Sequence, residues 1–369
     1  MDASPGLTPA ELAQRVGAGL LVPPSLLHRW YRRLEIDWFT SGMGRVCDAG
    51  RPTVAVGGLS ADGRGRVLLA SWLLGWAEAR GLRTAVTVPK GDGSPPSLPF
   101  AVPSDGDPWE SGMEAALLAR YTQGGHILMD TDCIRGARTA VHRYDPDVLL
   151  LQDAVGNPRI RRDLTLAILT PDDLGPGWNR LWPAGDWRTD ASALVRASAF
   201  CVFAGPDGLH AAMEAATRRL EPFRRPIFGL SFDMWRFRGP NGQASAADLA
   251  GEAYIVVLDE ADREMVPNLL RHKLGIGPRM AFFVHEHHRF TLQDFEHLRA
   301  DAVRLRAGNI LTSPRVALKL RSGGAALDGL AVWTYDPEVL FGPQRLTDLP
   351  FLSWWEAAFA AVTEGRPLP

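Results

Sequence analysis

The stretch from Pro52 to Gly81, PTVAVGGLSADGRGRVLLASWLLGWAEARG, decides the fold of this chain. Its first part, Thr53–Val56, is a short apolar run that predicts a buried strand. A glycine-rich turn follows, and apolar residues at helical spacing predict a helix from about Gly65 to Ala79. A strand, a glycine turn and a helix N-terminus in this order form the geometry in which backbone N–H groups bind phosphate.

The turn and the start of the helix supply four candidates for nucleotide binding, which are Ser60, Gly63, Gly65 and Arg66. A P-loop normally carries a lysine that reaches the β- and γ-phosphates and a Ser or Thr hydroxyl that binds Mg²⁺. Arg66 and Val67 occupy those two places here. An ordinary glycine turn between strand and helix explains the stretch equally well, so the rest of the sequence has to decide.

Composition points to a globular protein with two α/β domains. The chain has 369 residues, of which 46% are hydrophobic and 22% charged, with a formal net charge of −2. Near-neutral charge argues against a nucleic-acid partner. The three cysteines, Cys47, Cys133 and Cys201, have neither zinc-site spacing nor the pattern of a disulfide framework. Without a signal peptide or an apolar run of membrane-spanning length, the chain is expected to be cytoplasmic.

Residues 1–50 are expected to form a helical segment ahead of the first domain. Within them, Leu20–Arg33 combines Leu, Trp and Tyr with a basic cluster. Such a segment can lie in a membrane interface. A helix that packs on its own domain accounts for the same residues, and the sequence leaves both alternatives open.

Strands that alternate with helices predict a doubly wound parallel sheet of the P-loop type, followed by a second, smaller α/β domain. Arg224-Arg225-Pro226 marks the expected boundary between a P-loop-like domain, 51–225, and a smaller C-terminal domain, 226–369. The strands are expected at 53–56, 84–88, 127–129, 146–151, 163–169, 199–203, 254–258, 280–284, 310–311 and 331–334. The helices are expected at 65–79, 110–121, 135–143, 209–220, 264–274, 292–305 and 352–362.

Asp153 is the candidate for a metal site. With Gln152 it follows the apolar run PDVLLL at Pro146–Leu151, which is typical of a central parallel strand. Ligands bind beyond the C-terminal ends of such strands, so a carboxylate there can meet a Mg²⁺–nucleotide. An Asp that caps the following turn is the alternative.

Three further motifs occur in order along the chain. They are Arg162-Asp163, the stretch Asn179-Arg180-Leu181 followed by Pro183-Ala184-Gly185 and Arg188, and Phe283–Phe290. These resemble the RD pair, the NGRLLPAGPLRE loop and the FPDHHxF motif, with Glu286 in place of Asp, of the tetraacyldisaccharide 4'-kinase (lipid A 4'-kinase) family. The resemblance covers about residues 50–320.

The resemblance implies an enzyme that uses ATP and Mg²⁺ to phosphorylate the 4'-hydroxyl of a lipid A disaccharide precursor. It places such an enzyme in the cytoplasm, peripheral to the inner membrane surface. It also implies that His287 and Glu286 are catalytic and that four residues bind substrate. These four are Lys90, Asn179, Arg180 and Arg188.

The chain differs from the family at positions that the family uses for nucleotide binding, metal binding and catalysis. Besides Arg66 and Val67, Met113 stands where the family has a catalytic aspartate, and Asp153 is the one acidic residue left of its DDGLQH motif. A methionine cannot accept a proton or orient a histidine.

Three hypotheses therefore remain. The first is a 4'-kinase with impaired catalysis, in which Asp62, Asp92 or Glu114 could act as a local substitute. The others are a non-catalytic relative that binds a glycolipid or a protein, and an unrelated P-loop-like nucleotide binder.

Overall fold

The computed structural model describes residues 22–60, 65–240, 242–321 and 327–368, and the candidates Asp62 and Gly63 lie outside them. The chain divides into two compact units. Unit 1 comprises Met1–Pro89, Gly124–Leu230 and Phe341–Pro369, and unit 2 comprises Lys90–Gln123 and Ser231–Leu340.

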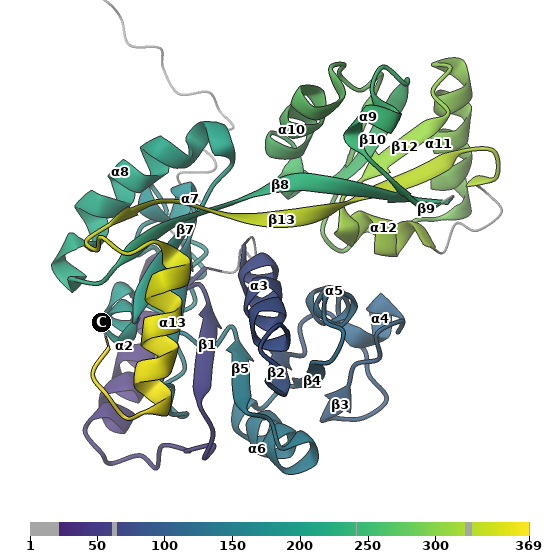
Figure 1. Ribbon diagram of the computed structural model, residues 1–369. Helices are drawn as coiled ribbons and strands as arrows, with labels where there is room; N and C mark the ends of the chain where they lie inside the picture. The colour runs from purple at the N-terminus through teal and green to yellow at the C-terminus, as the bar shows by residue number, and fades with distance from the viewer. Residues whose placement is uncertain (1–21, 61–64, 241, 322–326, 369) are drawn as a thin grey trace, which may run out of the picture. The chain divides into compact units, whose positions relative to one another are not determined.

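Unit 1 is built on a parallel sheet with the strand order β8-β7-β6-β1-β5-β2-β4 (Figure 1). Its strands are β1 (Thr53–Gly57), β2 (Thr84–Pro89), β4 (His126–Asp130), β5 (Val148–Gln152), β6 (Leu164–Leu169), β7 (Ala199–Phe203) and the start of β8 (Ile227–Gly239). Its helices are α2 (Val22–Thr40), α3 (Arg66–Glu78), α6 (Cys133–Tyr144), α7 (Pro171–Leu174), α8 (Leu209–Leu220) and α13 (Phe351–Thr363). Short 3₁₀ turns cover Ala191–Arg196, Pro206–Gly208 and Glu221–Phe223.

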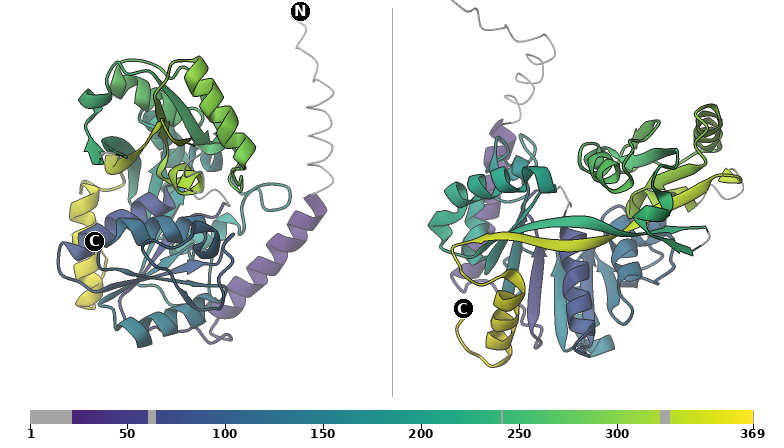
Figure 2. Two further views of the ribbon diagram at one scale, coloured as in Figure 1. Left: turned by 90° about the vertical axis from the view of Figure 1, so that its right-hand side faces the viewer. Right: turned by 45° about the horizontal axis from the view of Figure 1, so that its top comes forward.

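Helices cover both faces of this sheet. Figure 2 shows α13 and α2 on opposite sides of it. On one face α13 packs beside α3, with the rings of Trp76 and Trp355 at 5.4 Å in an edge-to-face arrangement. The central strands β1, β5, β6 and β7 are buried along their whole length, as continuous apolar sequences such as VLLLQ in β5 predict. The predicted doubly wound parallel sheet is confirmed.

In unit 2 the strand order is β11-β10-β12-β13-β8, with β9 antiparallel to β8. Its strands are β9 (Gly242–Ala244), β10 (Tyr254–Asp259), β11 (Ala281–Val284), β12 (Asn309–Thr312) and β13 (Ala331–Arg345), together with β3 (Phe100–Ala101). Its helices are α4 (Pro108–Ser111), α5 (Met113–Tyr121), α9 (Ala246–Leu249), α10 (Met265–Leu274), α11 (Leu292–Arg304) and α12 (Pro314–Leu320), with a 3₁₀ turn at Glu260–Asp262.

The units interleave along the chain, which differs from the predicted consecutive domains 51–225 and 226–369. The chain leaves unit 1 after Pro89 and re-enters it at Gly124, and both later boundaries fall inside the long strands β8 and β13. The predicted helix 110–121 is also corrected. It is two helices, because Gly112 has φ +74°, which a continuous α-helix does not accommodate.

Candidate active site

The predicted site residues fall into two groups, one in each unit. Ser60, Gly65, Arg66, Asp153, Asn179, Arg180 and Arg188 belong to unit 1, whereas Lys90, Glu286 and His287 belong to unit 2. The functional roles given to them remain predictions. Their geometry is described one unit at a time.

Arg66 and Asp153 form a buried ion pair. Arg66 is the first residue of α3, Asp153 follows the end of β5, and Arg66 Nη1 lies 2.7 Å from Asp153 Oδ1. Arg188 Nη1 donates to the other oxygen, Asp153 Oδ2. The expected nucleotide-binding arginine and the expected metal-binding carboxylate are therefore partners of each other.

Gly65 and Ser60, the described residues on either side of the glycine-rich turn, are both closely packed. Gly65 has φ +80°, and a Cβ there would lie 2.8 Å from Cγ of Phe203, so only glycine fits. The backbone of Ser60 forms a bridge with Trp187, and Ser60 Oγ lies 3.5 Å from Asp173 Oδ2. The same carboxylate accepts the indole N–H of Trp187 through Oδ1 at 2.7 Å. The 179–188 loop is thereby held against the turn.

The three predicted substrate residues in that loop differ in their contacts. Asn179 has φ +55°, and its side-chain oxygen accepts the N–H of Ala191 at 3.1 Å, so it shapes the loop. The exposed guanidinium of Arg180 has no hydrogen-bond or ion-pair partner among the described residues. Arg188 is half-exposed and is joined to Asp153.

Arg162 supports the loop that carries Asp153. Its Nη1 donates to the carbonyl oxygens of Ala154 and Val155, the latter at 2.9 Å. Burial, together with the nearby Arg196, lowers the pKa of Arg162 to about 10. Asp163 accepts the N–H of Thr53 at 2.9 Å and so fixes the start of β1. The RD pair noticed in the sequence therefore acts as a structural brace.

The described residues do not fit a Mg²⁺ site. Mg²⁺ is bound through oxygen ligands, but both oxygens of Asp153 face arginines, and Val67 offers no oxygen. Among the residues that the structure describes, no group of three His, Cys, Asp or Glu side chains could hold a metal ion. A 180 Å³ cavity beside Asp153, lined also by Asp130, Gln152 and Asn157, is flanked by polar groups.

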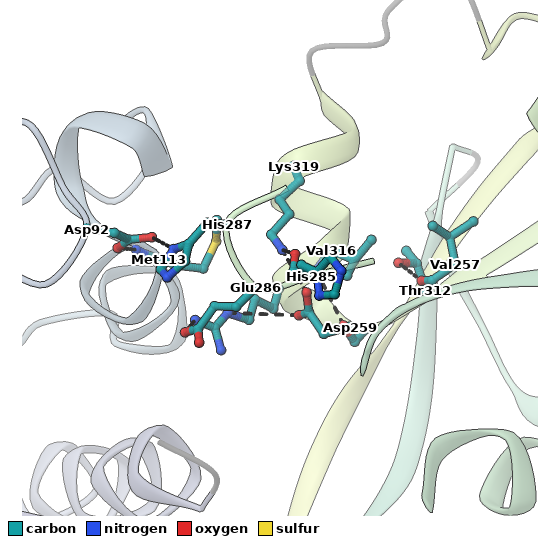
Figure 3. Close-up of polar contacts among 12 residues, drawn as sticks. Asp92, Met113, Val257, Asp259, His285, Glu286, His287, Thr312, Val316 and Lys319 are labelled. Atoms are coloured by element: carbon teal, nitrogen blue, oxygen red, sulfur yellow. Dashed lines mark hydrogen bonds and ion pairs between the residues drawn. The ribbon is translucent and has the colours of Figure 1, made fainter. Parts of the chain in front are cut away.

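In unit 2, His287 faces the carboxylate of Asp92, which the sequence offered only as one of three substitutes for lost catalytic groups. His287 Nδ1 lies 3.5 Å from Asp92 Oδ2, and Asp92 Oδ1 accepts the backbone N–H of Met113 at 3.4 Å (Figure 3). The imidazole is 71% exposed, so its other nitrogen can meet a substrate. Asp92 lies between two glycines in the loop that follows β2, Gly91-Asp92-Gly93.

Glu286 takes part in a charge network rather than standing free. Arg315 donates to Glu286 and lies 3.9 Å from Asp259 Oδ2, and Lys319 Nζ lies 2.7 Å from Asp259 Oδ1 (Figure 3). Although burial opposes its charge, Glu286, Asp259 and Glu114 raise the pKa of Arg315. The ammonium of Lys90 has no partner among the described residues of either unit.

Helix α2 binds the same loops of unit 1 through one face and exposes apolar side chains on another. Arg29 Nη2 donates to the carbonyl of Asn179 at 2.7 Å, Arg32 Nη2 donates to that of Gly156 at 3.1 Å, and His28 Nε2 lies 2.8 Å from the carbonyl of Arg188. The exposed side chains are Leu26, Leu27, Trp30, Tyr31, Leu34 and Trp38. No helix in the described ranges is long and apolar enough to cross a membrane.

Comparison with known proteins decides the family. The model of the Tetraacyldisaccharide-1-P 4'-kinase family matches residues 18–349. The chain belongs to this family. The Tetraacyldisaccharide 4'-kinase of Nitratidesulfovibrio vulgaris is 32% identical over 349 residues, which covers 95% of this chain and 96% of that protein. That of Oleidesulfovibrio alaskensis is 30% identical over 321 residues, with 85% and 88% covered.

A solved member of the Tetraacyldisaccharide-1-P 4'-kinase family has the same fold. The "apo" form of LpxK from Aquifex aeolicus, in complex with ATP, aligns with a TM-score of 0.65 at 20% identity, over 88% of this chain and 95% of that one. Glu286, which stands where the FPDHHxF motif has an aspartate, forms an ion pair with Arg315 in this chain.

Proposed function

We propose that this chain transfers a phosphoryl group from ATP to the 4'-hydroxyl of a tetraacylated disaccharide precursor of lipid A, more slowly than a relative with a complete P-loop. One observation carries the proposal. An exposed imidazole, His287, is in contact with a carboxylate, Asp92, in the loop that resembles the family's histidine motif. A histidine oriented in this way is suited to take a proton from an alcohol.

The nucleotide side supports weak binding of ATP. Two guanidinium groups, from Arg66 and Arg188, surround one carboxylate next to the N-terminus of α3, so the local charge favours an anion. A phosphate, however, has to compete with Asp153 for Arg66. Loss of one charge-stabilising donor costs about 10²–10³ in rate, so turnover is expected at least roughly 10³ below that of an intact relative.

The family implies Mg²⁺, but no step proposed here depends on the ion, because the described residues offer no complete ligand set. The residues of this chain do three things. Arg66 and Arg188 attract the phosphates, the 179–188 loop with Arg180 meets the sugar or its phosphate, and His287 removes the hydroxyl proton. The exposed apolar side chains of α2 support a place at the cytoplasmic surface of the inner membrane.

The test is a coupled ATP-consumption assay with the disaccharide lipid as acceptor, with mass spectrometry of the lipid product. Slow formation of the 4'-phosphorylated lipid is expected, and it should require His287. Turnover of the order of 1 s⁻¹, the low end of ordinary kinases, would show that the nucleotide site is not impaired.

A non-catalytic protein that binds the glycolipid or a protein partner is the second candidate. The mutual pairing of Arg66 and Asp153 favours it, because both residues are then withdrawn from ATP and metal. Under this alternative, the lipid binds but no phosphorylated product forms, even at high ATP.

A further inference from the structure

We infer that Asp92 is the positioning carboxylate of His287 and does the work of the aspartate that Met113 replaces. The inference rests on the proposed function. Asp92 lies in the loop after β2, His287 in the loop after β11, and Met113 at the start of α5. All three belong to unit 2, and Figure 3 shows the Asp92 carboxylate facing both the imidazole of His287 and the backbone N of Met113.

Close backbone contact brings Asp92 to this position. A Cβ on Gly93 would lie 2.6 Å from the N of Gly112 and 2.8 Å from the carbonyl oxygen of Glu110. Only glycine therefore lets the loop 90–93 approach the turn before α5 so closely. Gly112, at the N-terminal end of α5, has no side chain to cap the helix, and Asp92 accepts the Met113 N–H in its place at 3.4 Å.

The loop that carries His287 is anchored on both sides of the histidine. Glu286 is paired with Arg315, and the guanidinium of Arg289 lies 4.4 Å above the ring of Trp109. The next histidine has a different acid, because His288 Nε2 lies 3.4 Å from Asp294 Oδ2. Asp92 is thus specific to His287.

The two oxygens of Asp92 have different tasks, and this division gives the pair its chemistry. Oδ1 is held by the Met113 N–H, so Oδ2 is left to accept the Nδ1–H of His287. With its proton on Nδ1, the neutral imidazole presents a lone pair at Nε2. Nε2 accepts the hydroxyl proton while the sugar oxygen forms a bond to the γ-phosphorus and the bond to the ADP oxygen breaks. The resulting imidazolium faces the Asp92 carboxylate.

Asp92→Asn is the informative variant, because the structure predicts which way the amide will point. Its Oδ1 keeps the Met113 N–H, so its NH₂ group faces His287 Nδ1 and donates to it. The proton of the imidazole is then forced onto Nε2, where it blocks base catalysis. We expect kcat for 4'-phosphorylation to fall by about 10²–10⁴ with little change in KM for ATP.

Two further measurements separate positioning from folding and from the proposed function. Long-range ¹H–¹⁵N NMR of the full chain at alkaline pH should show the His287 proton on Nδ1 in the wild type and on Nε2 in Asp92→Asn. Asp294→Asn, which changes the partner of His288 instead, should leave both kcat and the His287 tautomer unaltered. Asp92→Asn/Met113→Asp restores a carboxylate and should recover kcat at least roughly tenfold.

The outcomes are distinct. An unchanged tautomer in Asp92→Asn overturns the inference, and so does full kcat in a variant whose tautomer has changed. If the wild type forms no phosphorylated lipid, the proposed function fails, while the NMR result still decides whether Asp92 orients His287.

Discussion

Arg66 Nη1 lies 2.7 Å from Asp153 Oδ1, and both side chains are almost fully buried, at 5% and 9% exposed. An arginine at the lysine position of a P-loop thus pairs with the acidic residue expected to meet the metal. Removing one partner of a buried ion pair leaves the other charge buried and uncompensated, which is destabilising. Replacing both partners by apolar residues of similar volume can instead be nearly neutral.

Asp153→Asn should destabilise unit 1 more than Arg66→Met. Asparagine tolerates the positive φ of 58° at this position but removes the negative charge that Asp153 holds beside the buried Arg66, at a cost of about 3 kcal/mol. Arg66→Met leaves Asp153 paired with the half-exposed Arg188 and should cost about 1 kcal/mol. Urea unfolding measures both. Glu356→Ala, which breaks an exposed pair with Arg80, serves as control; equal effects of all three would contradict the buried-pair argument.

Arg66→Lys/Val67→Thr should strengthen ATP binding. A lysine acts as a point charge towards the β- and γ-phosphates of ATP. A threonine supplies the hydroxyl ligand for Mg²⁺ that Val67 cannot supply. We expect Kd for ATP to fall roughly tenfold in the presence of Mg²⁺, measured by calorimetry, and less in its absence. No gain in either condition would mean that Asp153 still holds the new lysine, and Asp153→Asn in the same background would reveal this.

The sequence predicted the regular parts of the fold well, because buried parallel strands and amphipathic helices have clear periodicity. It missed β8, Ile227–Gly239, whose sequence mixes apolar and charged residues, and it ended β13 at 334 rather than Arg345. Both strands cross from one unit into the other, which local patterns do not reveal. Consecutive domains were predicted for the same reason.

The candidate site was predictable residue by residue but not contact by contact. Arg66 and Asp153 were named for separate roles, and 87 positions separate them in the numbering, so their pairing could not be read from local sequence. Asp92 was named only as one of three substitutes, because its contact with His287 depends on the close approach of its loop to Gly112. Pairing of this kind is set by topology.

Asn179→Ala should lower the stability of the fold, whereas Arg180→Ala should weaken lipid binding. Asn179 adopts a positive φ, and its side chain accepts the Ala191 N–H, so its loss should cost about 1–3 kcal/mol of stability. Arg180 is exposed, so its removal should leave stability within about 0.5 kcal/mol while weakening binding of the disaccharide lipid. Thermal unfolding and a lipid-binding titration on both variants check this. A stable Asn179→Ala variant that binds the lipid poorly would instead assign the contact to Asn179.

The exposed side chains of α2 should bind membranes. Leu27 is 70% exposed and Trp30 64% exposed, three residues apart on the helix, and burial of each in a lipid interface is worth about 1.5–3 kcal/mol. Leu27→Glu/Trp30→Glu should therefore lower co-sedimentation with anionic phospholipid vesicles at least roughly tenfold. Its melting temperature should not fall, because neither side chain is buried in the fold. Val303→Glu, which alters an equally exposed apolar residue of α11, should sediment like the wild type. If the double variant also sediments like the wild type, the exposed apolar face of α2 has another purpose than membrane binding.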